Sequence, residues 1–174
     1  VLAYTGAAKV DVIGHSMGVT LMRKALQGGP ASDLLAGGDY DLGPSLGDRV
    51  DTFVGISGSN RGLTLCFSSP TLPTCGATNG FYPGYYVGLV GPLDVSRLLD
   101  GLNSSGRREA AHVYSIWSTA DEVIGGGDLV WGRFTSQIPG QDGELRLSGI
   151  PYGHMNSKNL TVEQQLRMVR DHQP

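Results

Sequence analysis

The chain has 174 residues, a formal net charge of −3 and 40% hydrophobic residues, which suits one globular domain with a sizeable core. The net negative charge does not favour binding to nucleic acid. The sequence has no run of Lys and Arg that would bind an anionic membrane, and no apolar stretch long enough to span one. Glycine is the compositional outlier, with 27 residues, and together with nine prolines it predicts many tight turns.

The N-terminal part predicts a strand that turns sharply into a helix. Residues 1–6 are typical of the last turn of a helix, with Gly6 just beyond it. Residues 9–14 are almost continuously apolar, which indicates a parallel strand covered on both faces. The sequence Gly14-His15-Ser16-Met17-Gly18 follows, and residues 17–27 favour a helix that stops at Gly28-Gly29-Pro30.

This strand, turn and helix predict a nucleophile elbow centred on Ser16. The turn places the serine in a strained backbone conformation, and the glycines two positions away on either side leave room for the close approach of strand and helix. A serine held out in this way can attack a carbonyl carbon when a histidine accepts its proton. A merely structural glycine turn is the alternative, since the five-residue pattern also arises by chance.

The chain contains a second copy of the pattern, which serves as an internal control. Gly43-Pro44-Ser45-Leu46-Gly47 fits the same five positions, but no strand precedes it and no helix follows it. Residues 31–48 have no hydrophobic period, so we expect a loop there, with at most one helical turn at 32–35. Ser45 is therefore interpreted as a loop residue.

A long excursion follows the second predicted strand, residues 50–57. It begins at the glycine-rich segment 58–62, spans about residues 60–107 and includes one short helix, 94–102, capped by Asp94. Excursions of this length are usually functional loops or lids. We expect the aromatic residues of this excursion to form a lid or a wall of the substrate site, and the alternative is that they pack in a core under a long loop. These aromatic residues are Phe81, Tyr82, Tyr85 and Tyr86.

Cysteines and glycosylation patterns favour a secretory setting. A disulfide between Cys66 and Cys75 would close a small Ser/Pro/Thr-rich loop and stabilise by about 2.5 to 3 kcal/mol, while two free thiols are the alternative. Asn103 and Asn159 each begin an Asn-x-Ser/Thr acceptor pattern. We therefore expect a secreted glycoprotein.

The C-terminal part completes an alternation of strands and helices. Residues 112–118 predict a third strand, 125–143 a loop, 144–148 a fourth strand and 161–171 an amphipathic helix. The apolar face of that helix would be formed by Val162, Leu166 and Val169. The alternation indicates an α/β fold with a largely parallel sheet flanked by helices.

Ser16 requires a base, and the base requires an acid. His154 follows the last strand, on the sheet edge that carries the elbow, whereas His15 would project away from Ser16 and His112 begins a strand at the opposite edge. Asp121 directly follows the third strand and gives the chain order Ser, Asp, His of the α/β-hydrolases, with Glu122 as the alternative acid. Cysteine and histidine spacings favour no metal site, and the chemistry needs no cofactor.

With these residues the chain resembles the class 2 triacylglycerol lipase family of small α/β-hydrolases, particularly its secreted animal members. The segments that carry the resemblance are 4–7, 10–18, 118–125 and 153–154. The resemblance implies Ser16 as nucleophile, Asp121 as acid, His154 as base and the backbone N–H of Met17 as one oxyanion donor. It also implies a lipid ester substrate, with a lipid interface as a further partner.

One departure from the family pattern concerns the start of the chain. A His-Gly loop supplies the second oxyanion donor in that family, and no such segment precedes Val1. The resemblance therefore implies an α/β-hydrolase domain over 1–174 that lacks its N-terminal third and is a poor catalyst by itself. The competing reading is a non-catalytic relative that binds or stores a ligand.

Overall fold

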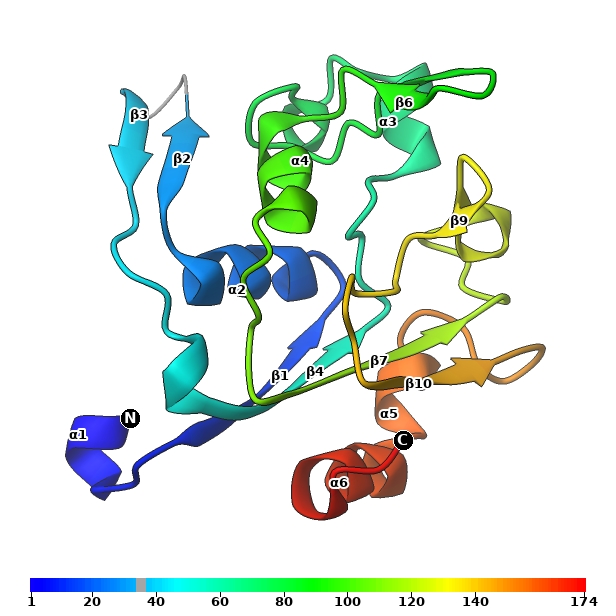
Figure 1. Cartoon of the computed structure of the whole chain (residues 1–174). Helices are drawn as coiled ribbons and strands as arrows, with labels where there is room; N and C mark the ends of the chain where they lie inside the picture. The colour runs from blue at the N-terminus through cyan, green and yellow to red at the C-terminus, as the bar shows by residue number, and fades with distance from the viewer. Residues whose placement is uncertain (34–36) are drawn as a thin grey trace.

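The chain forms a parallel four-stranded sheet flanked by helices, a partial α/β-hydrolase fold, in a computed structural model that describes residues 1–33 and 37–174 (Figure 1). The strands lie in the order β1-β4-β7-β10, and every neighbouring pair is parallel. The helices are α1 Leu2–Thr5, α2 Met17–Gln27, α3 Thr64–Ser68, α4 Arg97–Ser104, α5 Asn156–Asn159 and α6 Val162–Asp171. The strands are β1 Val10–His15, β2 Pro30–Asp33, β3 Gly38–Asp41, β4 Val50–Ile56, β5 Tyr85–Val87, β6 Gly91–Leu93, β7 His112–Ser118, β8 Leu129–Val130, β9 Arg133–Phe134 and β10 Gly143–Leu147, with single 3-10 turns η1 Gly47–Arg49, η2 Pro73–Cys75 and η3 Gly126–Asp128.

Two apolar clusters hold the helices against the two faces of the sheet. On one face, Val19 and Leu26 of α2 pack against Phe53 and Val113. On the other, Met168 of α6 packs against Val54 and its neighbours on the central strands. Figure 1 shows α2 on one side of the sheet and α5 and α6 on the other. Central strand β4 is therefore covered on both faces, as a parallel strand requires.

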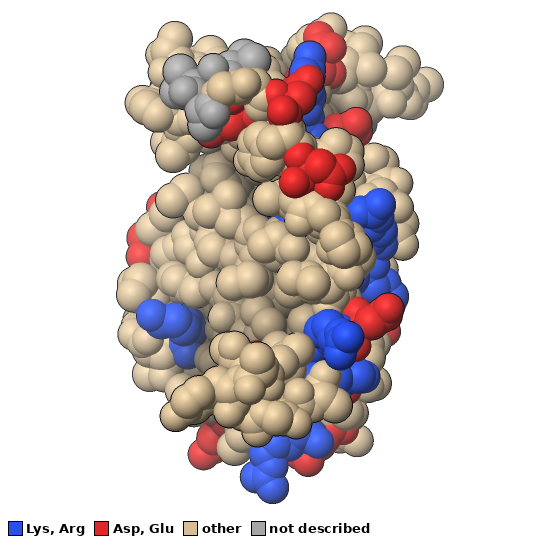
Figure 2. Space-filling model, turned by 90° about the vertical axis from the view of Figure 1, so that its left-hand side faces the viewer, with Lys and Arg blue, Asp and Glu red and all other residues tan. Residues whose placement is uncertain are grey.

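Strand β1 differs from the prediction that both of its faces are covered. It lies at the edge of the four-stranded sheet, and among the described strands it pairs only with β4. Ile13 is 49% exposed, although its apolar character suggested a buried position. Nearby, Met17, Leu21 and Met22 of α2 are also exposed. Figure 2 shows a face whose middle carries few charged side chains, with most Lys, Arg, Asp and Glu residues towards its rim.

Two segments predicted as loops contain small hairpins. Strands β2 and β3 pair antiparallel where a loop over 31–48 was expected. Ser32 and Asp33, which were predicted to begin a helical turn, lie in β2. The other two residues of that predicted turn, 34 and 35, lie outside the described residues. Strands β8 and β9 form a second hairpin within 125–143. Both predictions were wrong because backbone hydrogen bonds hold these strands together. Their side chains do not alternate between apolar and polar, so the sequence pattern did not indicate strands.

The excursion has regular structure and a small core of its own. The disulfide between Cys66 and Cys75 is confirmed, and both residues pack with Phe81 and Leu99. Phe81 is therefore a core residue, whereas Tyr85 and Tyr86 are 41% and 51% exposed. The excursion thus combines a cross-linked interior with an exposed aromatic edge.

The helix cap in the excursion lies two residues later than predicted. Asp94 does not cap the helix, since α4 begins at Arg97 and the Ser96 hydroxyl accepts a hydrogen bond of 3.3 Å from the Leu99 N–H. The same hydroxyl donates to the Gly80 carbonyl at 2.7 Å. Ser96 therefore both caps α4 and ties it to the cysteine-containing segment.

A buried polar network joins the excursion to α2. The Arg23 guanidinium donates to Glu109 at 2.7 Å, with side-chain exposures of 1% and 2%. It also donates to the side-chain oxygens of Asn60 and Asn103 at 3.1 and 3.2 Å. A buried charge that lost its partner would be strongly destabilising, so this network fixes the excursion relative to the helix that follows the elbow.

The buried face of the last helix agrees only in part with the apolar face that the sequence predicted, since Val169 packs against the core but Val162 and Leu166 do not. Met168 is fully buried, while Val162 and Leu166 are 61% and 49% exposed. Gln165 lies on the buried face because its amide donates to the Lys158 carbonyl at 2.6 Å and to the Thr161 hydroxyl at 3.0 Å. A polar side chain whose hydrogen bonds are satisfied is thus buried at the position where hydrophobicity alone predicted Leu166.

Candidate active site

Ser16 lies at the sharp turn between β1 and α2. Its backbone has φ 58° and ψ −136°, a strained conformation for a residue with a side chain, and its N–H donates to the Ile56 carbonyl at 2.8 Å. A Cβ on Gly14 would lie 3.1 Å from the Val19 backbone, so this glycine permits the close packing of strand and helix. Gly18 has no described atom within 4 Å of such a Cβ, so the expectation of close packing there is wrong. The Ser16 side chain makes no capping bond to α2, which leaves its hydroxyl available.

His154 and Asp121 form a buried pair, although they lie in different loops. His154 Nδ1 lies 2.8 Å from Asp121 Oδ2, and the two residues are 5% and 3% exposed. Asp121 follows β7 and His154 follows β10, and these neighbouring parallel strands end at the same edge of the sheet. The structure thus brings together the histidine and the acid that the sequence selected.

Hydrogen bonds keep the Asp121 carboxyl ionised in spite of its burial. Burial alone would raise its pKa, but the bond from His154 and the backbone N–H of Ile124 outweigh that effect, and the pKa is lowered. Oδ1 accepts from the N–H groups of Val123 and Ile124 at 3.0 and 2.9 Å. An ionised Asp121 can only accept a hydrogen bond, so the proton of the pair lies on His154 Nδ1.

Glu122, the alternative acid, contacts the backbone of His154 and not its ring. Its Oε2 accepts the His154 N–H at 2.9 Å, and this bond is the main cause of the lowered pKa of Glu122. A Cβ on Gly153 would lie 2.5 Å from the same carboxylate oxygen, so a side chain there would displace the Glu122 carboxylate from this bond. Glu122 therefore holds the loop that carries the histidine, a position that chain order alone did not reveal.

His15 lies against the site instead of away from it. Its ring centroid is 4.7 Å from that of His154, and its Nε2–H donates to the His154 carbonyl at 3.1 Å. Burial is the main cause of the lowered pKa of His15. By contrast, His112 stacks on His172 at 3.7 Å, at the strand end away from the elbow. The contact with His15 places the loop of His154 directly against the elbow.

No hydrogen bond joins the Ser16 hydroxyl to His154 within the part of the chain that the structure describes. Contacts between nucleophile and base are often long without substrate and shorten in the reacting complex. The Met17 N–H begins α2 and belongs to the first turn, whose N–H groups have no acceptor within the helix. It therefore lies next to the serine with a donor available for a ligand.

Ser57, which the sequence analysis did not select, lies beside the acid. It follows β4 at the same sheet edge, has φ 50° and is fully buried. Its hydroxyl has no well-formed hydrogen bond, yet it is close enough to help lower the pKa of Asp121. A polar residue directly after a buried strand was the only signal for it in the sequence.

A second buried aspartate, Asp128, lies in the neighbouring loop and keeps its proton up to about pH 6. Ser136 Oγ lies 2.6 Å from Asp128 Oδ1 and 2.9 Å from the Gly58 carbonyl oxygen. The hydroxyl has one proton and the carbonyl can only accept, so a protonated carboxyl satisfies all three groups. Burial is the main cause that raises the pKa of Asp128 to about 6.

We expect Asp128→Asn to stabilise the protein above pH 6. In the wild type, the folded-state pKa of about 6 exceeds the usual 3.8, so stability contributed by the protonated form is lost as pH rises through this range. That difference corresponds to about 3 kcal/mol, and an asparagine supplies the same donor and acceptor without titrating. Urea unfolding between pH 4 and 8 measures the effect, with the exposed Asp100→Asn as control. A stability difference that is the same at every pH would contradict a protonated Asp128.

The remaining predicted site residues lie apart from the histidine–aspartate pair. Tyr85 and Tyr86 lie on β5 of the excursion, and Cys66 and Cys75 lie in its core. Among the described residues, no group of three or more His, Cys, Asp or Glu side chains is arranged to hold a metal ion. The described helices also include none with the length and apolar character needed to cross a membrane.

Comparison with known proteins places the chain in a family. The family model "Lipase (class 2)" matches residues 1–167, nearly the whole chain. A search of curated proteins gives no match. The family match indicates a lipolytic ester hydrolase of the lipase or esterase kind. The parallel sheet, the elbow and the extent of the match together show that this chain belongs to the class 2 lipase family.

Proposed function

We propose that this chain is a serine hydrolase that cleaves carboxylic esters, acylglycerols among them, through an acyl-enzyme on Ser16. The observation that carries the proposal is the buried contact of 2.8 Å between His154 Nδ1 and Asp121 Oδ2, beside a serine with a strained backbone. Membership of the lipase family supports lipid esters as the substrate class.

In the proposed mechanism, His154 Nε2 accepts the hydroxyl proton of Ser16 as the serine oxygen attacks the ester carbonyl. Asp121 holds the ring with its Nδ1–H towards the carboxylate and stabilises the imidazolium that forms. The Met17 N–H donates to the developing oxyanion. His154 then protonates the leaving alcohol, and a water activated by the same histidine hydrolyses the acyl-enzyme.

Glu122 and His15 act as positioning residues in this proposal. Glu122 accepts from the His154 N–H, and His15 donates to the His154 carbonyl, so both polar backbone groups of the catalytic base are held. Such support keeps the imidazole in its productive orientation without contact with the substrate.

We infer that the excursion over about 60–107 forms a lid that contacts acyl chains or a lipid surface. Its hairpin of β5 and β6 exposes apolar side chains, with Leu89 fully exposed and Val90 at 72%. Exposed apolar residues at a hairpin tip suit a lipid interface better than water. The disulfide would give this lid a fixed base.

Replacing Tyr85 and Tyr86 together by serine tests the role of the excursion. Each side chain would lose apolar contact with a long acyl chain, so we expect KM for long-chain esters to rise by about tenfold and KM for short-chain esters to change little. Tyr4→Ser is the control, since Tyr4 is 95% exposed on α1. Equal changes for both chain lengths would show that the tyrosines only pack the excursion.

We also propose that the protein is a secreted glycoprotein. The disulfide suits an oxidising compartment. Asn159 is exposed at the end of α5 and is free to carry a glycan. Asn103 is half-buried and hydrogen-bonded to Arg23 and to the Asn60 carbonyl, so we favour Asn159 as the modified residue.

A further inference from the structure

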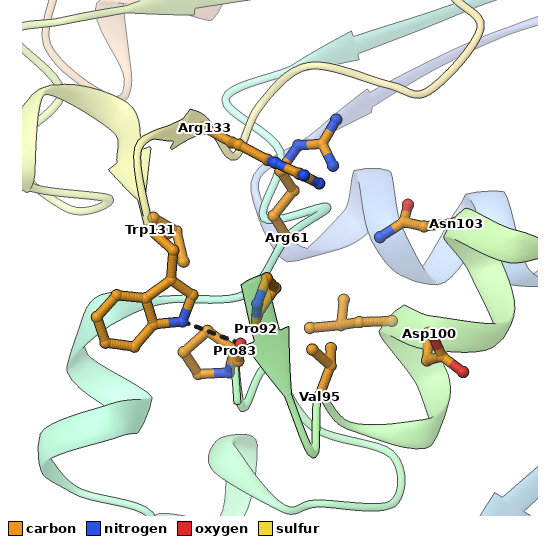
Figure 3. Close-up of a pocket in the computed structure, with 10 residues that line it drawn as sticks. Arg61, Pro83, Pro92, Val95, Asp100, Asn103, Trp131 and Arg133 are labelled. Carbon is orange, nitrogen blue, oxygen red and sulfur yellow. Dashed lines mark hydrogen bonds between the residues drawn. The ribbon is translucent and has the colours of Figure 1, made fainter. Parts of the chain in front are cut away.

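A small pocket lies between the excursion, α4 and the β8–β9 hairpin. Its volume is about 180 Å³, and Figure 3 shows Trp131 beside Pro83 at one end and Val95 towards Asp100 at the other, with Pro92 between them. One water molecule needs only about 10 to 15 Å³ of such space, so the pocket has room for a polyatomic group. It involves neither Ser16 nor His154.

Two arginines without partners line this pocket. Arg61 follows β4 and Arg133 belongs to β9, and in Figure 3 their side chains reach towards one another. Neither guanidinium has a hydrogen bond or ion pair with any described residue, and Arg61 Nε is buried without a partner. Asp100 also lines the pocket, but Figure 3 shows its carboxylate turned away from both arginines.

The charges of Arg61 and Arg133 favour a bound anion between them. Burial, followed by the charges of Arg133 and Arg23, lowers the pKa of the Arg61 guanidinium. Arg61 is half-buried, whereas Arg133 is exposed. The two like charges repel each other, and the buried Arg61 Nε–H without an acceptor destabilises further. An anion between the two guanidinium groups would remove both penalties.

The walls indicate what kind of anion fits. The Trp131 indole N–H donates to the Pro83 carbonyl at 3.1 Å, and its ring meets Phe67 edge-on at 5.0 Å, so this wall is held in place. Guanidinium groups from two different elements can each bind two oxygens of a tetrahedral group, whereas a planar carboxylate offers only two oxygens in all. The apolar remainder of the wall suits an organic substituent on that group.

We propose that this pocket binds a phosphate group between Arg61 and Arg133. The phosphate can come from free phosphate or from the headgroup of an anionic lipid. Pro92 of the pocket wall belongs to the same hairpin that exposes Leu89 and Val90, so a hairpin seated in a lipid surface brings headgroup phosphates near the pocket. The site is separate from the proposed catalytic chemistry.

A titration with inorganic phosphate at constant ionic strength tests the site. We expect phosphate to raise the melting temperature of the wild type and to change its tryptophan fluorescence through Trp131. Arg133→Gln and Arg61→Gln should each weaken the apparent affinity by about tenfold or more, since each removes charge-assisted bonds. Arg170→Gln, an exposed arginine on α6, is the control for the loss of one positive charge.

Without phosphate, Arg133→Gln should melt no lower than the wild type, because it removes a repulsion and no partner. Ser16→Ala should bind phosphate as the wild type does, which separates this site from the proposed hydrolase activity. Equal phosphate affinity in the wild type and in both pocket variants would overturn the proposal, as would the absence of any phosphate effect in the wild type.

Vesicles distinguish the two sources of phosphate. We expect vesicles of phosphatidylcholine with phosphatidic acid to bind more protein than phosphatidylcholine alone, and this gain to be lost in Arg133→Gln but kept in Arg170→Gln. That result assigns the pocket to a lipid headgroup. Phosphate binding that depends on Arg133, with no vesicle gain, supports the pocket as a site for free phosphate.

Discussion

Ser16→Ala is expected to lower kcat for ester hydrolysis by about 10⁶ while leaving the fold intact. Loss of the nucleophile in a serine hydrolase has an effect of this size, because the remaining groups cannot form the acyl-enzyme. The Ser16 hydroxyl makes no capping bond to α2, so its removal takes away no structural contact. Hydrolysis of a chromogenic ester measures kcat, and thermal unfolding checks the fold.

The chain supplies a matched control for this variant. Ser45 occupies the same place in a second Gly-x-Ser-x-Gly pattern, but its hydroxyl donates to the Leu26 carbonyl at 3.2 Å and accepts from the Gly47 N–H. Ser45→Ala should therefore reduce stability slightly and leave kcat unchanged. Turnover in Ser16→Ala equal to that of the wild type would remove Ser16 from the mechanism.

Asp121→Asn is expected to lower kcat by about 10⁴. An asparagine amide keeps the shape of the carboxylate but favours the wrong tautomer of His154, and the analogous change in another serine hydrolase has this effect. Glu122→Gln is the matched control, since Glu122 contacts the His154 backbone N–H and not its ring. Its amide oxygen can still accept that bond, so kcat should fall by less than about tenfold.

The pair of variants also decides which carboxylate is the acid. The pH profile of kcat/KM gives a second readout, because it reports the essential base of the free enzyme. Loss of the ring partner in Asp121→Asn should alter the acid limb of that profile, whereas Glu122→Gln should leave it in place. A larger loss in Glu122→Gln than in Asp121→Asn would contradict the assignment of Asp121.

The parts of the site that the sequence predicted are those set by local pattern and by sheet geometry. Ser16 was identified from the strand and helix on either side of it. Asp121 and His154 were placed together because residues that follow parallel strands share one edge, and their contact of 2.8 Å agrees with that rule. Neither step required knowledge of long-range side-chain packing.

The parts that the sequence missed depend on hydrogen bonds between distant segments. Gln165 lies on the buried face of α6 because two local acceptors satisfy its amide, which hydrophobic periodicity does not register. The raised pKa of Asp128 depends mainly on its burial, which the sequence of its loop does not show. Arg61 and Arg133 come to line the same pocket only when the β8–β9 hairpin packs against the segment that follows β4.

The central claim is that Ser16 is a nucleophile activated by His154, and covalent labelling tests it most directly. A fluorophosphonate reacts with an activated serine and leaves an adduct that mass spectrometry locates after trypsin digestion. Cleavage after Lys9, Arg23, Lys24 and Arg49 separates Ser16, in peptide 10–23, from Ser45, in peptide 25–49. The account predicts one adduct, on peptide 10–23, that is lost in His154→Ala. An adduct on peptide 25–49, or labelling of Ser16 at the same rate in His154→Ala, would contradict it.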